Sequence, residues 1–135
     1  MVLVDTSIWS LALRRANAGQ SYEVRELHQL ISDSRVVLIG PIRQELLSGI
    51  RYQNHYDRLR NRLRPFPDKP LATSDYELAA EFFNTCRANG VQGSNTDFLI
   101  CAVASKHNYS IFTNDQDFFL FQAYLPISLH PTATG

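Results

Sequence analysis

The chain has 135 residues, of which 44% are hydrophobic and 19% charged, and its 13 basic and 13 acidic residues cancel. This length and composition suit one globular domain and leave no room for two. No apolar run approaches the roughly 18 residues of a membrane span, and no basic segment of the signal-peptide kind opens the chain. We therefore expect a single domain over residues 1–130, a frayed tail over 131–135, and no membrane contact.

The two cysteines indicate the compartment. Cys86 and Cys101 stand among apolar residues at helical spacing. Such placement is typical of small buried thiols in a reducing environment rather than of a disulfide. Together with the absence of a signal segment, this favours a cytoplasmic protein.

The first half of the chain alternates short apolar runs with helical patterns. A β-branched run followed by polar residues predicts a strand and then a helix cap, and an apolar run closed by Gly40 and Pro41 predicts a buried parallel strand. In chain order we expect a strand at 2–4, a helix from Ile8, a helix at 22–31, a strand at 36–39 and one long helix at 42–63.

The second half continues the alternation after three prolines end the long helix. A capping-box pattern at 74–77 opens the next helix. We expect a short edge strand at 71–72, a helix from 74 to about 90, a helix from 97 to about 107, and strands at 110–113 and 126–129. Alternating strands and helices predict an α/β fold, a three-layer α/β/α sandwich whose sheet has four or five mostly parallel strands. Right-handed crossovers align the carboxyl ends of such strands at one edge, where ligands bind.

Acidic residues from four segments fall at that edge. They are Asp5 after the first strand, Glu45 one turn into the long helix, Asp97 at a helix start, and Asp115 and Asp117 after a late strand. Each alone could be a helix cap, a surface residue or a turn former, but they share the strand-end position. Carboxylates gathered in one place repel each other, and a divalent cation compensates that repulsion. Oxygen-only donors favour Mg²⁺ or Mn²⁺, and the histidines and cysteines lack zinc-ligand spacing.

The basic residues are unevenly placed. Eleven of the thirteen are arginine, and Arg51, Arg58, Arg60, Arg62 and Arg64 crowd one segment. Arginine suits bidentate contact with phosphate, although a solvated helix face explains the cluster equally well. On one helix, Arg58 and Arg62 share a face and Arg60 and Arg64 share another, so we expect only one pair to reach a phosphate backbone.

The aromatic residues are numerous, with 8 Phe, 6 Tyr and 1 Trp. Trp9, Tyr52 and Tyr56 lie on helical segments with polar neighbours. We expect them to be exposed and to mark a binding surface, although Tyr52 and Tyr56 could instead cover the core of their own domain.

At the acidic residues the chain resembles the PIN-domain ribonucleases. The segment 4–8, with Asp5 in Val-Asp-Thr-Ser-Ile, looks like the family's first motif, and Glu45 is similar to its helical glutamate. Asp97 opens a segment similar to the third motif, in which Cys101 replaces the usual alanine, and the segment 113–118 matches the last motif. The four motifs occur in order over essentially the whole chain.

The resemblance implies a PIN-like fold and an endoribonuclease that depends on Mg²⁺ or Mn²⁺. Asp5, Glu45, Asp97 and Asp115 would be the catalytic acids that hold metal, Asp117 a further metal ligand, and Thr6 and Thr113 supporting polar residues. The RNA-binding candidates are then Arg51, Arg58 and Arg62. The compact length resembles the VapC toxins, which cleave RNA, commonly form homodimers, and are held inactive by a cognate antitoxin protein.

Other classes remain as alternatives. A catalytically inactive PIN-like RNA-binding module would keep the fold without needing the acids. A phospho-receiver-type α/β signalling domain needs a lysine after a late strand, whereas Lys106 falls on a predicted helix. Flap-type DNA nucleases share similar acid clusters but carry a helical arch, for which this chain has no insertion.

Overall fold

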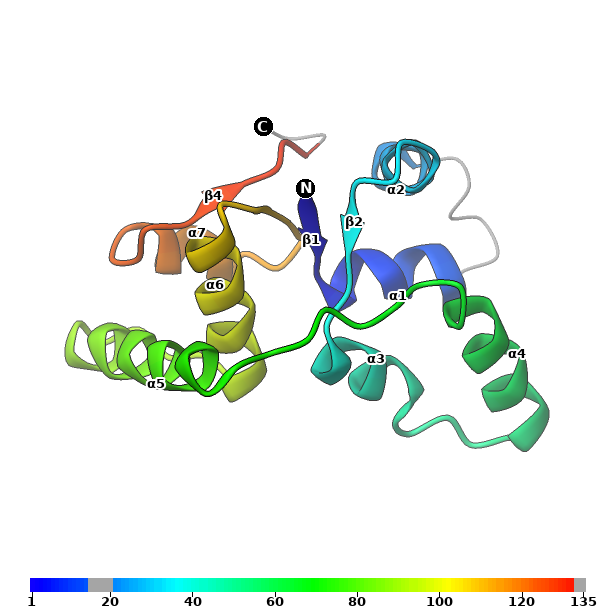
Figure 1. The fold of residues 1–135 in the computed structure, drawn as a ribbon, viewed down its shortest axis with the longest axis horizontal. Coiled ribbons are helices and arrows are strands. Elements are labelled where there is room, and N and C mark those ends of the chain that lie inside the picture. Colours follow the sequence, from blue (N-terminus) through cyan, green and yellow to red (C-terminus); the bar gives the residue numbers. More distant parts are fainter. Residues whose placement is uncertain (15–20, 133–135) are drawn as a thin grey trace.

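A four-stranded parallel sheet organises the chain (Figure 1), in a computed structural model that describes residues 1–14 and 21–132. The strands are β1 (Val2–Val4), β2 (Val36–Val37), β3 (Ser110–Phe112) and β4 (Ser128–Leu129). They pair in the order β2-β1-β3-β4, and every pairing is parallel. The α/β class and the strand count are thus as predicted.

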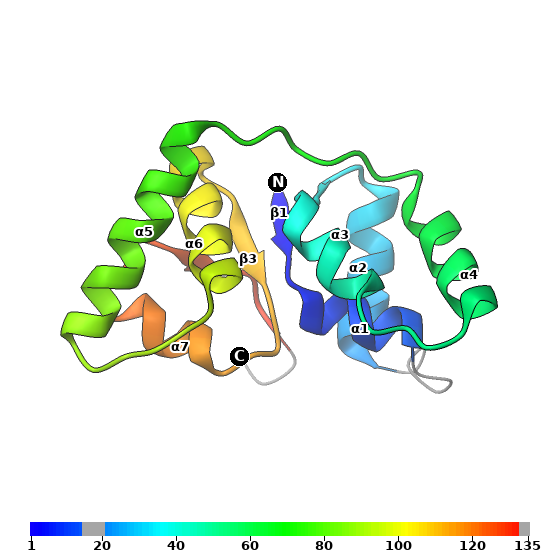
Figure 2. The same cartoon turned by 90° about the horizontal axis from the view of Figure 1, so that it is seen from below.

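Seven helices in the described part of the chain cover the sheet. They are α1 (Thr6–Arg14), α2 (Tyr22–Ser32), α3 (Gly40–Leu47), α4 (Gln53–Leu63), α5 (Thr73–Ala88), α6 (Asn95–His107) and α7 (Asp117–Gln122). Helices α1 to α4 gather toward β2, and α5 to α7 toward β4 (Figures 1 and 2).

Helix α6 is the most deeply buried of these helices. Its residues 98–104 are all buried, so α6 is enclosed on every face rather than along one stripe. Asp97 at its first turn is therefore carried by a rigid element.

The expected long helix over 42–63 is wrong. The structure has two helices, α3 and α4, separated by residues 48–52. Ser48 is extended, and Gly49 has a φ of +79°, a conformation that favours glycine. As a result Arg51 lies before α4 rather than on it.

The expected edge strand at 71–72 is also wrong. The chain instead makes a single parallel bridge between Asp68 and Leu38. Arg43 of α3 fixes this segment, because its guanidinium binds Asp68 Oδ1 at 2.9 Å and donates to the carbonyls of Leu63 and Phe66. The proline-rich connection between α4 and α5 is thus tied to the body of the molecule.

Three helix starts and one helix differ from the prediction. Helix α6 begins at Asn95 instead of Asp97. Helix α1 begins at Thr6 instead of Ile8, and α5 begins after Ala72, with Asp75 rather than Glu77 as the acid that caps it. Helix α7 had no counterpart among the predicted elements.

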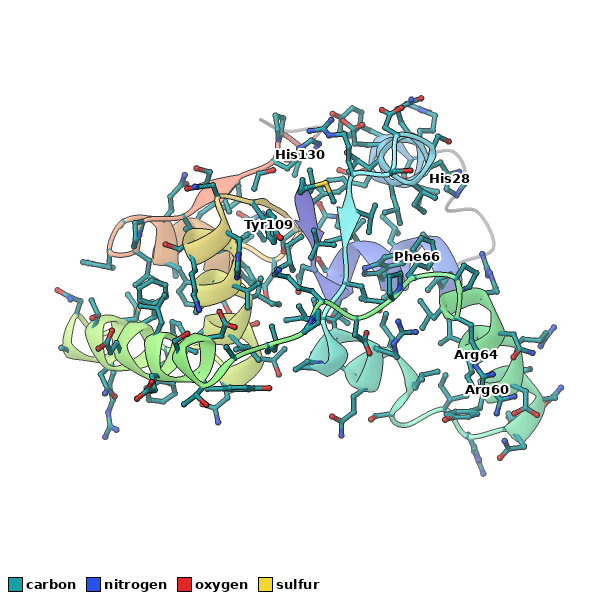
Figure 3. The ribbon with its side chains drawn as sticks, viewed as in Figure 1. His28, Arg60, Arg64, Phe66, Tyr109 and His130 are labelled. Atoms are coloured by element: carbon teal, nitrogen blue, oxygen red, sulfur yellow. The ribbon has the colours of Figure 1, made fainter. Side chains whose placement is uncertain are left out.

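The aromatic residues divide between core and surface. Trp9 is only 2% exposed and packs edge-on against Phe66, with ring centroids 5.2 Å apart, so its expected exposure is wrong. Figure 3 shows Phe66 beside α1, in the connection that Arg43 holds. Tyr52, in contrast, is 57% exposed, and Tyr56 is half-buried.

The cysteine prediction is confirmed, because Cys86 and Cys101 are both buried and free, and burial raises the pKa of both thiols. Of the predicted tail, residues 133–135 lie outside the described residues. Within residues 1–14 and 21–132, no helix combines the length and apolarity needed to cross a bilayer.

Asp75 ties α5 to α6. Its side chain is 2% exposed, its Oδ2 accepts a hydrogen bond from Ala72 N at 2.7 Å, and its Oδ1 lies 3.3 Å from Lys106 Nζ and 3.8 Å from His107 Nε2. Burial raises the pKa of Asp75, but the Ala72 bond and the charges of Lys106 and His107 outweigh it and lower the pKa overall.

Replacing Asp75 with alanine should lower the free energy of unfolding by about 2 kcal/mol, since a helix cap and a partly exposed ion pair are removed together. Because its folded-state pKa is lowered, this contribution is present above the ordinary aspartate pKa of 3.8 and is lost as pH falls through the folded value. Urea unfolding should show a constant wild-type advantage above about pH 5, and that advantage should shrink as the pH falls below about 4. A pH-independent difference would show that the charge of Asp75 is not what stabilises the contact.

Candidate active site at the carboxyl edge of the sheet

The register between β1 and β3 creates the site. Val4 is opposite Phe112 in the parallel ladder, and the N–H of Asp5 donates to the carbonyl of Phe112 at 2.9 Å. The residues that follow the two central strands, Asp5 and Thr113, are therefore neighbours at the carboxyl edge.

Two hydroxyl groups hold the Asp5 carboxylate. Asp5 is 6% exposed, and its Oδ2 accepts hydrogen bonds from Thr113 Oγ1 at 2.8 Å and Ser7 Oγ at 2.9 Å. Each hydroxyl group also accepts a hydrogen bond from a backbone N–H. Asp115 N donates to Thr113 Oγ1 at 2.9 Å, and Asn114 N donates to Ser7 Oγ at 3.0 Å. The loop after β3 and the first turn of α1 are thus joined through the charge of Asp5.

Asp97 is held from α6. It forms a capping box with Ser94, in which Ser94 N donates to Asp97 Oδ2 at 3.0 Å and Asp97 N donates to Ser94 Oγ at 3.1 Å. Burial raises the pKa of Asp97, the hydrogen bonds with Ser94 oppose that shift, and the charges of Asp5 and Asp115 raise the pKa further. Asp97 is therefore a helix cap and also a member of a group of repelling carboxylates.

Glu45 joins the same group from α3. The residue as a whole is exposed, but partial burial of its carboxyl group raises its pKa, and the charges of Asp5 and Asp97 add to this. Thr6 opposes the shift. Its buried Oγ1 has no hydrogen-bond partner of normal geometry among the described residues, but it lies near Glu45, and its hydroxyl group lowers the pKa of that carboxyl group. We call Asp5, Glu45, Asp97 and Asp115 the carboxylate set.

Asp117 has a different relation to the set. It is exposed at the first residue of α7, and its N–H donates to Asp115 Oδ1 at 2.9 Å. Its link to the set is therefore through the backbone.

The carboxylate set does not form a closed ligand shell. Among residues 1–14 and 21–132, no three His, Cys, Asp or Glu side chains converge closely enough to hold a metal ion as they stand. Burial and repulsion together raise the pKa of Glu45 and Asp97, and Lys106 does not offset the repulsion, because it lies at the far end of α6 and pairs with Asp75. That position also argues against a receiver-type site.

The arginines separate into the two faces expected from helix geometry. Arg58 and Arg62 line an open pocket of about 500 Å³ with His55 and Leu59. Arg60 instead approaches Asp57 at 3.5 Å and lies over the ring of Tyr56 at 5.8 Å. Figure 3 shows Arg60 on α4 and Arg64 just after its end, and α4 lies at the opposite end of the molecule from α5.

Sequence reasoning assigned no role to Ser7 or Ser94. Ser7 follows Asp5 by two residues and could have been predicted to bond it. The three-residue spacing between Ser94 and Asp97 is the signature of a capping box, and it was the available signal for the second serine.

A family model of the PIN domain matches residues 2–122. The chain belongs to the PIN-domain family. This PIN-domain protein is 31% identical over 122 residues to a VapC ribonuclease of Mycobacterium bovis and to ribonuclease VapC11 of Mycobacterium tuberculosis. The alignment covers 87% of this chain and 89% of each relative.

Solved structures show the same fold. FitAcB from Neisseria gonorrhoeae is similar with a TM-score of 0.76 and 23% identity, over 97% of both chains. VapBC2 from Rickettsia felis, bound to a DNA fragment from its promoter, is similar with a TM-score of 0.77 and 17% identity, over 96% of this chain and 98% of that one. These likenesses confirm the PIN-like sandwich.

Neutralising one acid of the set should stabilise the metal-free protein. Asp97→Asn keeps an oxygen that can accept from Ser94 but removes a charge whose folded-state pKa is raised. A raised pKa means that the ionised Asp97 costs stability as pH rises through that value. We expect the mutant to melt a few degrees higher than wild type in EDTA at about pH 7.5, and the gain to vanish near about pH 4. A lower melting temperature at both pH values would mean that the cap, not the repulsion, dominates.

Proposed function

We propose that this PIN-domain protein is a metal-dependent endoribonuclease and the toxin of a VapC-type toxin–antitoxin pair. The carboxylate set carries the proposal: burial raises the pKa of Glu45 and Asp97, and the charges of neighbouring acids from other segments, Asp5 for both groups and Asp115 for Asp97, raise it further. The VapC ribonucleases that are 31% identical over most of the chain support it. We propose that residues 1–130 form the single nuclease domain.

The donors fit a hard divalent cation. They are carboxylate oxygens with hydroxyl groups beside them, and their mutual repulsion is the imbalance that a bound Mg²⁺ or Mn²⁺ would remove. Asp5, Glu45, Asp97 and Asp115 would hold the ion, with Asp117 next to them. When bound, such an ion supplies charge neutralisation at the phosphate and acidifies the water that attacks phosphorus.

The chain's own contribution is to hold two acids rigidly and leave others adjustable. Asp5 is fixed by Ser7 and Thr113, and Asp97 by Ser94 on the buried helix α6. Glu45, on α3, is exposed, so its carboxylate can turn toward the two fixed acids. Thr6 and Thr113 support the set because their hydroxyl groups lie against Glu45 and Asp5.

The RNA backbone would be bound by Arg58 and Arg62, with Arg51 nearby. The pocket that the first two line lies on α4, on the β2 side of the molecule. Arg60 is engaged by Asp57, which leaves it less free to bind phosphate. An RNA held at α4 would cross the carboxyl edge of the sheet.

The biological setting follows from the same proposal. Two buried free thiols suit the reducing cytoplasm. A cognate antitoxin protein would cover the active face, and a homodimer would place two carboxylate sets in one assembly. Exposed Tyr52 is available to either contact.

The activity prediction is specific. The purified protein should cut single-stranded RNA with Mg²⁺ or Mn²⁺, stop in EDTA, and leave 5′-phosphate and 3′-hydroxyl ends, because water rather than the ribose 2′-hydroxyl attacks. Asp5→Asn should reduce the single-turnover rate constant by at least about 100-fold. Asp33→Asn, the same substitution at an exposed helix end, is the matched control and should be near wild type.

Two outcomes would contradict this activity. Cleavage in EDTA that leaves cyclic phosphates would indicate metal-free acid–base chemistry. RNA binding with no cleavage under any metal would favour the inactive PIN-like RNA-binding module.

The arginine assignment is tested by charge reversal in pairs. Arg58→Glu with Arg62→Glu should weaken RNA binding and reduce the salt dependence of the affinity by about one unit of slope for each phosphate that is no longer bound. Arg60→Glu with Arg64→Glu is the control, with equal charge change on the same helix, and should leave the slope nearly unchanged. Equal weakening by both pairs would show that the helix acts only through its net charge.

A further inference from the structure

A second pocket lies on the α5 side of the carboxylate set. Its volume is about 380 Å³, within the roughly 300–1,000 Å³ of small-molecule sites. The walls that matter here come from three helices: Pro41 of α3, Tyr76, Phe83 and Asn84 of α5, and Asn95 and Thr96 of α6.

Two of these residues connect the pocket to the carboxylate set. Pro41 and Glu45 are four residues apart on α3 and therefore share a face of that helix. Thr96 directly precedes Asp97 in the first turn of α6. Helices α3 and α6 thus each carry a residue of the pocket and a residue of the carboxylate set. If the phosphate of a ligand lies at the acids, the group attached to that phosphate can lie at the pocket.

The lining selects an uncharged, flat ligand with polar edges. None of the lining residues is charged, so the pocket offers no partner for a phosphate. Tyr76, 54% exposed, and Phe83 offer aromatic rings. Asn84 and Asn95 each offer a donor and an acceptor in one plane. An unpaired base is recognised in this way, by stacking on aromatic rings and by hydrogen bonds to its edge.

We propose that this pocket receives one unpaired base of the RNA substrate, next to the bond that is cut, and so determines the sequence preference of cleavage. The inference rests on the proposed ribonuclease function. The arginine pocket on α4 and this pocket lie on opposite sides of β1, as Figure 2 shows for the helices that carry them. The RNA backbone is bound at α4, its phosphodiester lies at the carboxylate set, and its base enters between α5 and α6.

The test begins with ligands that are uncharged and need no metal. Adenosine, guanosine, cytidine and uridine are titrated separately into the protein in EDTA while the side-chain amide signals of Asn84 and Asn95 are followed by NMR. Ala80→Leu, at an exposed lining residue, narrows the pocket, and Ala88→Leu is the same change on the same helix outside it. At least one nucleoside should shift both amides, with an affinity weakened at least 5-fold by Ala80→Leu and unchanged by Ala88→Leu.

A second arm measures cleavage of an RNA library of random sequence. Wild type and Ala88→Leu should prefer one base at a fixed position beside the cut, and Ala80→Leu should lose that preference. No cleavage by wild type would contradict the proposed function, whereas the nucleoside titration would still decide the pocket. Nucleosides that shift neither amide, or that bind Ala80→Leu equally well, overturn the inference. So does a shift of the same amides on dilution without nucleoside, which would show that a second copy of the chain covers the pocket.

Discussion

The alignment of β1 with β3 is the constraint on which the site depends. Because Val4 is opposite Phe112, Asp5 meets Thr113, and one carboxylate oxygen becomes the acceptor for hydroxyl groups from two distant segments. A shift of one residue in this register would turn Asp5 to the other face of the sheet and separate it from Thr113. The fully buried residues of both strands make such a shift costly, so the apolar core fixes the position of the charge.

The same arrangement explains why the site opposes the stability of the fold. Acids that stabilise a domain elsewhere are paired, as Asp75 is with Lys106, and their pKa is lowered. Glu45 and Asp97 have raised pKa values, because burial and neighbouring acids disfavour their ionised forms. Repulsion that a protein retains at one place is a sign that a ligand of opposite charge relieves it. The bonds from Ser7, Ser94 and Thr113 keep two of the acids in position in the meantime.

Much of this was readable from the sequence, because strand ends are marked by apolar runs and parallel strands share an edge. On that ground Asp5 and Asp115 were expected at the carboxyl edge, with Glu45 and Asp97 brought there by the helices that follow the strands, and their shared role in metal binding stays a prediction. The break at Gly49 was not predicted, since apolar residues on both sides continued the helical spacing. Trp9 was misjudged because its partner, Phe66, comes from a connection whose path Arg43 determines. The pocket between α5 and α6 depends on how three helices pack, which local patterns do not encode.

The central claim is that the acids of the carboxylate set together form one cation-binding site, and paramagnetic broadening by Mn²⁺ tests it most directly. In the amide NMR spectrum of the wild-type protein, low Mn²⁺ should first broaden the signals of Thr6, Asp97 and Asp115, and Mg²⁺ should reverse the effect by competition. Asp5→Asn should abolish this pattern, while Asp33→Asn should preserve it. Broadening that begins at another acidic surface, or that survives Asp5→Asn unchanged, would contradict a shared metal site at the carboxyl edge of the sheet.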